Sequence, residues 1–256
     1  MDLSLNGILP PLLLVAAFAI TLVAAFVKGA TGFAMPMIMI SGLASFLSPE
    51  LALAGLILPT LVTNGMQALR DGPAAAWDAV RRYRLFFLIG GVFLVLSGQL
   101  VTAVNPRIIY ALIGVPIMLF GVAQLSGWKP AITSEHRRRA EIGLGAVAGG
   151  IGGISGVWGP PLVMYLTALD TPKTEQVRVQ GVGFGMASIL LLGTHLQTGV
   201  LNAQTVPFSV ILLAPALAGM WLGQRVHDRL DQAMFRRMTL AVLVVAGLNL
   251  IRRAVF

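Results

Sequence analysis

The sequence consists largely of apolar runs that approach the length of a bilayer crossing. Hydrophobic residues make up 57% of the 256 residues and charged residues 11%, whereas a soluble domain carries roughly 25% charged residues. The mean hydropathy is +0.85. About 20 apolar residues span the hydrocarbon core as a helix, and backbone polar groups in lipid must be satisfied within the chain. We therefore expect an all-α polytopic membrane protein.

We expect these runs to form helices joined by short polar loops. They cover about residues 8–47, 51–69, 85–104, 108–125, 142–169, 179–196, 207–223 and 238–251. Basic residues gather in the loops 70–84 and 127–141, and such an excess is typical of cytoplasmic loops. No basic segment precedes the first apolar run, so we expect no cleaved signal peptide.

A short glycine-proline motif occurs twice, each time inside a long apolar run. Four pairs of positions align at one offset of 124 residues, namely Gly29 with Gly153, Thr31 with Ser155, Gly32 with Gly156, and Pro36 with Pro160. Glycine and proline interrupt helices. We therefore predict two homologous halves of about four helical elements each, in residues 1–126 and 142–256, with a broken or re-entrant helix at the start of each. Residues 127–141 form the basic cytoplasmic linker between them.

The orientation of the two halves depends on the run 142–169. If this run crosses the membrane once, the halves are parallel; if it enters, breaks and returns, they are inverted repeats. Residues 160–169 would make only about 15 Å of helix, which suits a limb that crosses half of the membrane. The inverted arrangement also places the basic segment 225–237 in the cytoplasm, whereas Arg252 and Arg253 favour the parallel one. We predict inverted repeats.

The two interruptions predict a binding site for a small anion. A broken helix exposes backbone polar groups, which is tolerated in a membrane only beside protein or water. Pro36 and Pro160 stand where a new helix would begin, and a helix N-terminus attracts anions. Interrupted helices at matching places of two halves indicate a transporter binding site. For either copy alone, close helix packing by glycine is the alternative.

Further polar residues inside the apolar runs are candidates for the same site. Lys28 is costly in lipid unless it faces water or a partner, or unless it reaches the membrane surface. Asn64 and Gln67 share one helix face and either extend a polar pathway or bond between helices. Trp158 lines the pocket or packs, and His195 relays protons or lies at the interface. The predicted substrate-binding residues are Lys28, Gly29, Thr31, Gly32, Pro36, Asn64, Gln67, Gly153, Ser155, Gly156, Trp158, Pro160 and His195.

Several other classes of protein are disfavoured. The chain has no cysteine, which excludes disulfides and thiolate chemistry, and its three histidines form no metal-ligand spacing. The acidic residues lie in loops or near a terminus, so we expect no enzyme, no cofactor and no metal. The net charge of +8 is spread over loops rather than on a nucleic-acid-binding face. An anion channel built from the same helix ends is the alternative to a carrier.

These motifs resemble the TauE/SafE sulfite exporter family, also called the toluene sulfonate uptake permease family. The resemblance rests on G-x-[ST]-G-x-x-x-P at residues 29–36, G-x-S-G-x-x-G-P-P at residues 153–161, and Thr171-Pro172. The first copy departs from the commoner G-x-G-G-G form and follows a lysine.

The resemblance implies a multi-pass secondary transporter of the bacterial inner membrane. Its substrate would be a sulfur-containing or organic anion such as sulfite, sulfoacetate or another sulfonate, moved by alternating access. Export, uptake of another organic anion, a coupling proton or other ion, and the oligomeric state all stay open.

Overall fold

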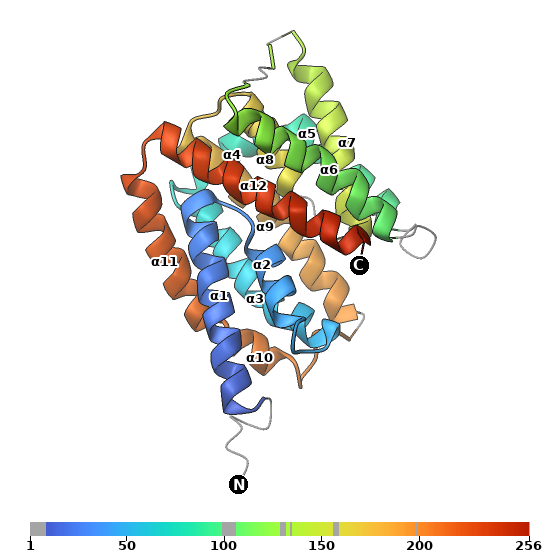
Figure 1. Ribbon diagram of the computed structural model, residues 1–256, viewed down its shortest axis with the longest axis vertical. Coiled ribbons are helices and arrows are strands. Elements are labelled where there is room, and N and C mark those ends of the chain that lie inside the picture. Colours follow the sequence, from blue (N-terminus) through green and yellow to red (C-terminus); the bar gives the residue numbers. More distant parts are fainter. Residues whose placement is uncertain are drawn as a thin grey trace. The chain divides into compact units, whose positions relative to one another are not determined.

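The computed structural model describes residues 9–98, 106–128, 132–133, 135–155, 159–197 and 199–255. This part of the chain is helical and contains no strand (Figure 1). The helices are α1 (Pro11–Thr31), α2 (Met35–Leu43), α3 (Pro49–Leu69), α4 (Pro73–Arg82), α5 (Arg84–Gly98), α6 (Pro106–Leu125), α7 (Arg137–Ser155), α8 (Gly159–Ala168), α9 (Lys173–Gln197), α10 (Val206–Ile211), α11 (Leu213–Arg229) and α12 (Gln232–Val255).

The predicted all-α class is confirmed. Five helical segments of the described chain are long and apolar enough to cross a membrane, and Arg84–Ser97 is a shorter apolar helix. The five segments are Pro11–Thr31, Leu51–Leu69, Lys173–Gln197, Val206–Arg229 and Gln232–Val255.

The described chain has more helices than the eight apolar runs predict. Instead of about four helical elements, the predicted first half contains α1–α6, and α7–α12 follow it, of which α7 begins at Arg137 within the predicted linker. The runs 8–47 and 142–169 each contain two helices, and the run 207–223 is divided at Leu212. Helix α4 lies within the loop 70–84; it buries Ala79 and exposes Trp77 and Arg81. A search for apolar runs misses such a helix because only one of its faces is apolar.

The chain folds as two compact units. Unit 1 consists of Met1–Arg70 and Gly181–Leu230, and unit 2 of Asp71–Gln180 and Asp231–Phe256. Helix α9 therefore begins in unit 2 and ends in unit 1. The predicted boundaries at residues 126 and 142 describe a sequence repeat rather than these units, and they stay a prediction.

In unit 1, α1 and α11 lie side by side with their backbones in direct contact (Figure 1). A Cβ atom built on Gly223 would lie 2.8 Å from the Cα atom of Gly29, and one built on Gly29 would lie 2.9 Å from the Cα atom of Gly223. A Cβ atom on Gly219 would collide with the carbonyl oxygen of Leu22. Glycine at these positions is therefore what allows the two helices to approach so closely.

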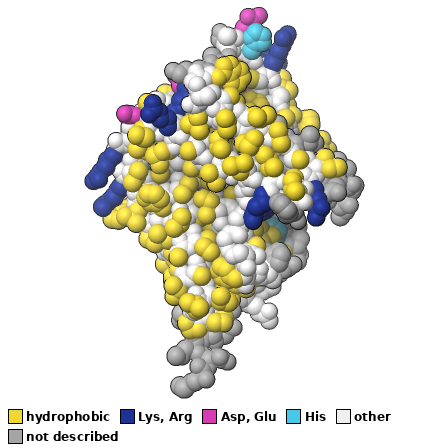
Figure 2. Space-filling view, viewed as in Figure 1, with side chains coloured by type: hydrophobic (Ala, Val, Ile, Leu, Met, Phe, Trp, Pro, Cys, Tyr) yellow, Lys and Arg dark blue, Asp and Glu magenta, His cyan; other side chains and the backbone are white. Residues whose placement is uncertain are grey.

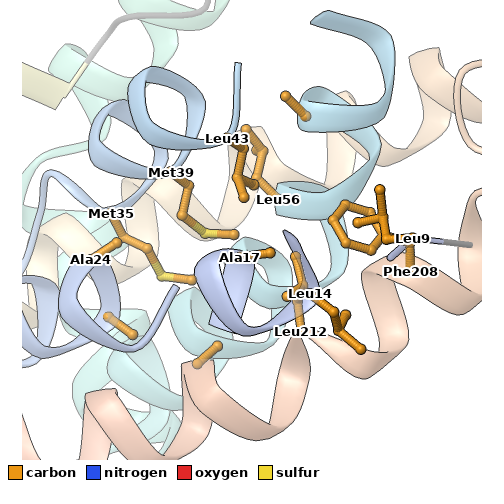
Figure 3. Close-up of a cluster of buried hydrophobic side chains, with 13 residues drawn as sticks. Leu9, Leu14, Ala17, Ala24, Met35, Met39, Leu43, Leu56, Phe208 and Leu212 are labelled. Atoms are coloured by element: carbon orange, nitrogen blue, oxygen red, sulfur yellow. The ribbon is translucent and has the colours of Figure 1, made fainter. Parts of the chain in front are cut away.

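The apolar core of unit 1 holds α2 in place. Figure 3 shows Met35 and Met39 of α2 among the buried side chains of α1 and of Leu56 on α3. The flexible methionine side chains fill the irregular space between helices. The buried members of this core are Leu9, Leu14, Ala17, Ala24, Ala25, Met35, Met39, Leu43, Ala52, Leu56, Phe208, Leu212 and Ala216.

In unit 2, α5 packs along α7 and α6 packs along α12. Glycine again lies at both contacts. A Cβ atom on Gly149 of α7 would collide with the carbonyl oxygen of Gly90 on α5, and one on Gly114 of α6 would lie 2.8 Å from the carbonyl oxygen of Gly247 on α12. Helix α8 contacts α6, α7 and α12.

Two tyrosine–carboxylate hydrogen bonds join the helices of unit 2. The Tyr83 hydroxyl donates to Glu175 Oε1 over 2.9 Å, and the Tyr165 hydroxyl donates to Glu141 Oε1 over 2.7 Å. Each carboxylate also pairs with an arginine, Arg82 at 3.0 Å and Arg137 at 3.2 Å respectively. Burial, and then the hydrogen bond to Glu175, raises the pKa of Tyr83 to about 12.

Large apolar side chains cover much of the outer surface. On the face shown in Figure 2, hydrophobic side chains occupy most of the area, and charged side chains lie mainly toward its edges. Leu12 of α1 is 80% exposed and Val245 of α12 is 66% exposed. Water-facing monomers rarely show such extended apolar surfaces, whereas lipid tails match them.

Candidate functional site

The first interruption is a tight turn of three residues between α1 and α2. Helix α1 ends at Thr31, and Gly32 follows with a φ of 89° while its N–H donates to the carbonyl oxygen of Lys28 over 2.6 Å. Glycine is the usual residue for this left-handed position after a helix. Helix α2 begins at Met35, with Pro36 in its first turn. The carbonyl end of α1 and the N–H end of α2 therefore lie next to each other.

One side of α3 contacts this turn and the helix ends beside it through three polar side chains. Gln67 Nε2 donates to the carbonyl oxygen of Gly32 over 2.9 Å, and the Thr63 hydroxyl lies 3.5 Å from Met35 Sδ. Asn64 Oδ1 accepts a hydrogen bond from Lys28 Nζ. All of these side chains are buried. The structure thus brings together Lys28, Gly32, Asn64 and Gln67, which the sequence analysis predicts as site residues.

Lys28 is 1% exposed. Its amine makes one hydrogen bond within the described chain, to Asn64, and none of the ion pairs there involves it. It lies in the last turn of α1, where the helix dipole favours a cation. A protonated lysine carries three N–H donors, so it retains capacity to bond a ligand.

Asn64 is held from a second side by α9. Its Nδ2 atom donates to Ser188 Oγ over 2.7 Å and to the carbonyl oxygen of Phe184 over 3.1 Å. These two bonds fix the amide orientation and direct Oδ1 toward Lys28. Ser188 follows Asn64 by 124 residues, the offset of the repeated motif, and that equality is the sequence signal that points to this contact.

Helices α3 and α9 run in opposite directions along their contact. Asn64 meets Phe184 and Ser188, whereas a Cβ atom on Gly181 would lie 2.6 Å from the backbone nitrogen of Ala68. As the residue number rises from 64 to 68 along α3, the number of the facing residue on α9 falls from 188 to 181.

Gly29 and Thr31 of the first copy make contacts that serve helix packing and the helix itself. Gly29 packs against α11, as described above, which is the close-packing alternative for that glycine. The Thr31 hydroxyl donates to the carbonyl oxygen of Val27 over 2.8 Å, within its own helix. His227 of α11, which the sequence analysis does not single out, is buried with Nδ1 3.3 Å from the carbonyl oxygen of Ala30. It belongs to the basic segment 225–237, and a histidine in a basic polar segment is not a signal for a buried site.

The second copy of the motif belongs to unit 2. Gly153 and Ser155 lie in the last turn of α7, and Pro160 lies buried in the first turn of α8. Gly156 and Trp158 lie outside the described residues. His195 is in the last turn of α9, partly exposed, and its carbonyl oxygen accepts a bond from the Leu201 N–H over 3.0 Å. The part of these residues in substrate binding stays a prediction.

One helix start repeats at the same offset as the motifs. Helix α3 begins at residue 49 and α9 at residue 173, which are 124 residues apart. At this offset Lys28 corresponds to Gly152, so the repeat supplies an amine in one copy only.

These features define a class of protein. The chain has several helices that are long and apolar enough to cross a membrane, and it buries an amine, two amides and a helix N-terminus. These features together are typical of membrane transport proteins. The chain belongs to the TauE/SafE sulfite exporter family, because the family model "Sulfite exporter TauE/SafE" matches residues 17–250. The predicted membership is thereby confirmed, and this is a family of membrane transporters. Neither a curated protein nor a solved structure matches the chain.

Proposed function

We propose that this protein is a secondary transporter that carries a small sulfur-containing or organic anion, such as sulfite, sulfoacetate or another sulfonate, across the bacterial inner membrane. The observation that carries the proposal is Lys28, a buried amine with no carboxylate partner in the described chain. A buried ammonium without a counter-charge costs several kcal/mol. A bound anion would supply that counter-charge.

The surroundings of Lys28 supply donors rather than acids. The first N–H groups of α2 have no acceptor inside their own helix, and they carry the positive end of its dipole. The Asn64 and Gln67 amides fix the turn and the amine from the side of α3. Sulfite and sulfonate groups present several oxygen acceptors in a small volume, which suits clustered donors of this kind.

We propose further that the two halves are inverted repeats. The support comes from α3 and α9, which begin 124 residues apart and run in opposite directions along their contact. In addition, Asn64 bonds to Ser188, its counterpart in the repeat. Equivalent positions touch each other only near a two-fold axis. This relation favours alternating access by two inverted halves.

In the second motif copy, the residues proposed to bind substrate are Gly153, Ser155, Gly156, Trp158 and Pro160, with α8 as the counterpart of α2. We place His195, in the last turn of α9, on the path by which protons pass between the site and solvent.

Flux through reconstituted vesicles tests the transport function. We expect the wild type to move sulfite or sulfoacetate with saturable kinetics, in either direction according to the gradient, and Lys28→Gln to lose at least tenfold in rate. Arg138→Gln is the matched control, because it removes one positive charge from an exposed position of α7. Equal flux in Lys28→Gln and wild type would remove Lys28 from the site. Non-saturating ohmic currents would favour the anion channel.

A further inference from the structure

The Lys28 amine has Asn64 Oδ1 as its acceptor and no carboxylate partner within the described chain. One acceptor is enough for a buried neutral amine, whereas a buried ammonium needs further acceptors and a counter-charge. Asn64 cannot turn to offer more, because its Nδ2 atom is committed to Phe184 and Ser188.

We propose that Lys28 takes up one proton each time an anion binds, so that anion and proton cross the membrane together. This inference rests on the proposed function of the same site. The nitrogen lone pair of the neutral amine accepts a proton from water on the side from which the anion enters. The resulting ammonium bonds to the anion, and release of the anion on the other side returns the proton to solvent. With a monovalent anion, charge balances within the site at both stages.

The elements packed around Lys28 offer few competing titratable groups. Helix α2 contains none, and Glu50 of α3, whose side chain is outside the described ones, lies at the opposite end of α3 from Asn64. On α11, Asp228 pairs with Arg70 at 2.6 Å, and Arg225 and Arg229 are exposed. The unit 1 part of α9 contains His195, near its end. His227 on α11 is the buried alternative, since it contacts the carbonyl oxygen of Ala30.

Calorimetry on the purified full chain measures the proton directly. Methanesulfonate and sulfoacetate are suitable probes because their sulfonate groups keep their charge over the range tested. Titrations in two buffers of different ionisation enthalpy give the number of protons taken up per anion. We expect about one proton per anion, with an affinity that falls by up to about tenfold per pH unit over the range in which anion binding is accompanied by proton uptake, by linkage.

Two variants assign the proton to a residue. Lys28→Arg stays charged at every pH tested, so we expect it to bind the probes with no proton uptake and with an affinity independent of pH. His227→Gln should keep the uptake of the wild type. The wild-type measurement stands even where a variant fails to fold.

The outcomes separate the two proposals. Binding by the wild type without proton uptake would overturn the coupling and leave the anion site intact. Uptake that persists in Lys28→Arg and disappears in His227→Gln would assign the proton to His227 and also overturn the proposal. Failure of the wild type to bind either probe would remove the anion site, and the coupling with it.

Discussion

At the scale of single residues, the candidate site depends on Asn64. This side chain bonds to α1 through Lys28 and to α9 through Phe184 and Ser188. The two polar atoms of its amide are thus engaged on two different helices. A buried amide with every polar atom engaged holds its neighbours in one arrangement.

We predict that Asn64→Leu removes anion binding and lowers the stability of the protein. The substitution leaves the buried Lys28 amine without its acceptor, and an unsatisfied buried polar group costs about 1–3 kcal/mol. Thermal unfolding in detergent, with and without sulfoacetate, measures both effects. Thr239→Val, which removes a buried hydroxyl in unit 2, is the control and should keep the ligand-induced shift. A normal shift in Asn64→Leu would contradict the assignment.

A second residue-scale prediction concerns the contact between α1 and α11. Gly29→Ala places a methyl group against the backbone of Gly223 and Met220, so we expect a loss of about 1–3 kcal/mol from overpacking. Gly65→Ala on α3 is the matched control, because no atom lies within 4 Å of its Cβ position. It should be neutral or slightly stabilising. Equal stability of the two variants would argue against the close packing described.

The sequence was a good guide to some site residues and a poor one to others. Lys28, Asn64 and Gln67 stood out because polar side chains inside apolar runs need partners, and the structure brings them together. The hydroxyl of Thr31 instead bonds within its own helix. Whether a threonine hydroxyl turns inward or outward depends on its side-chain rotamer, which residue spacing does not specify.

At the scale of elements, the short helix α4 shows what a search for apolar runs misses. Helix α4 is amphipathic and lies in a basic loop, so it contributes no apolar run. Its last turn leads to Tyr83, whose hydroxyl reaches the first turn of α9 at Glu175. Partners so far apart in the chain are set by tertiary packing, and the sequence analysis accordingly did not predict this link.

We predict that the stabilisation contributed by the Tyr83 hydroxyl is lost as the pH rises into the alkaline range. Burial raises the pKa of Tyr83 to about 12, above the value of about 10 for an unfolded tyrosine. The unfolded chain therefore loses this proton first, and stability falls as pH rises above about 10, by on the order of 1–2 kcal/mol at about pH 11. Thermal unfolding between about pH 8 and 11 measures it. Tyr83→Phe should show a shallower decline, and an identical decline would assign the effect to other groups.

At the scale of the whole molecule, the sequence predicted the membrane class and the family well. Both depend on features that survive without coordinates, namely long apolar runs and a repeated motif. The sequence analysis did not predict the division into two compact units, because unit 1 and unit 2 each combine segments from both predicted halves. Which distant segments pack together depends on side-chain fit rather than on hydropathy.

The inverted arrangement predicts that the loops after α3 and α9 lie on opposite sides of the membrane. The native chain has no cysteine, so single cysteines report without background. We expect a membrane-impermeant maleimide to label Gln204→Cys in intact cells and Ala74→Cys only after permeabilisation; both positions are exposed. Labelling of the two from the same side would support parallel halves instead.

The unequal repeat at Lys28 and Gly152 bears on the driving force. One amine neutralises one negative charge, so a carrier loaded with a monovalent sulfonate and the proton on Lys28 moves no net charge. Membrane voltage would then leave such a cycle almost untouched, while the acidity difference across the membrane would set how far the solute accumulates. A divalent cargo would make the same cycle electrogenic, and its rate would respond to voltage.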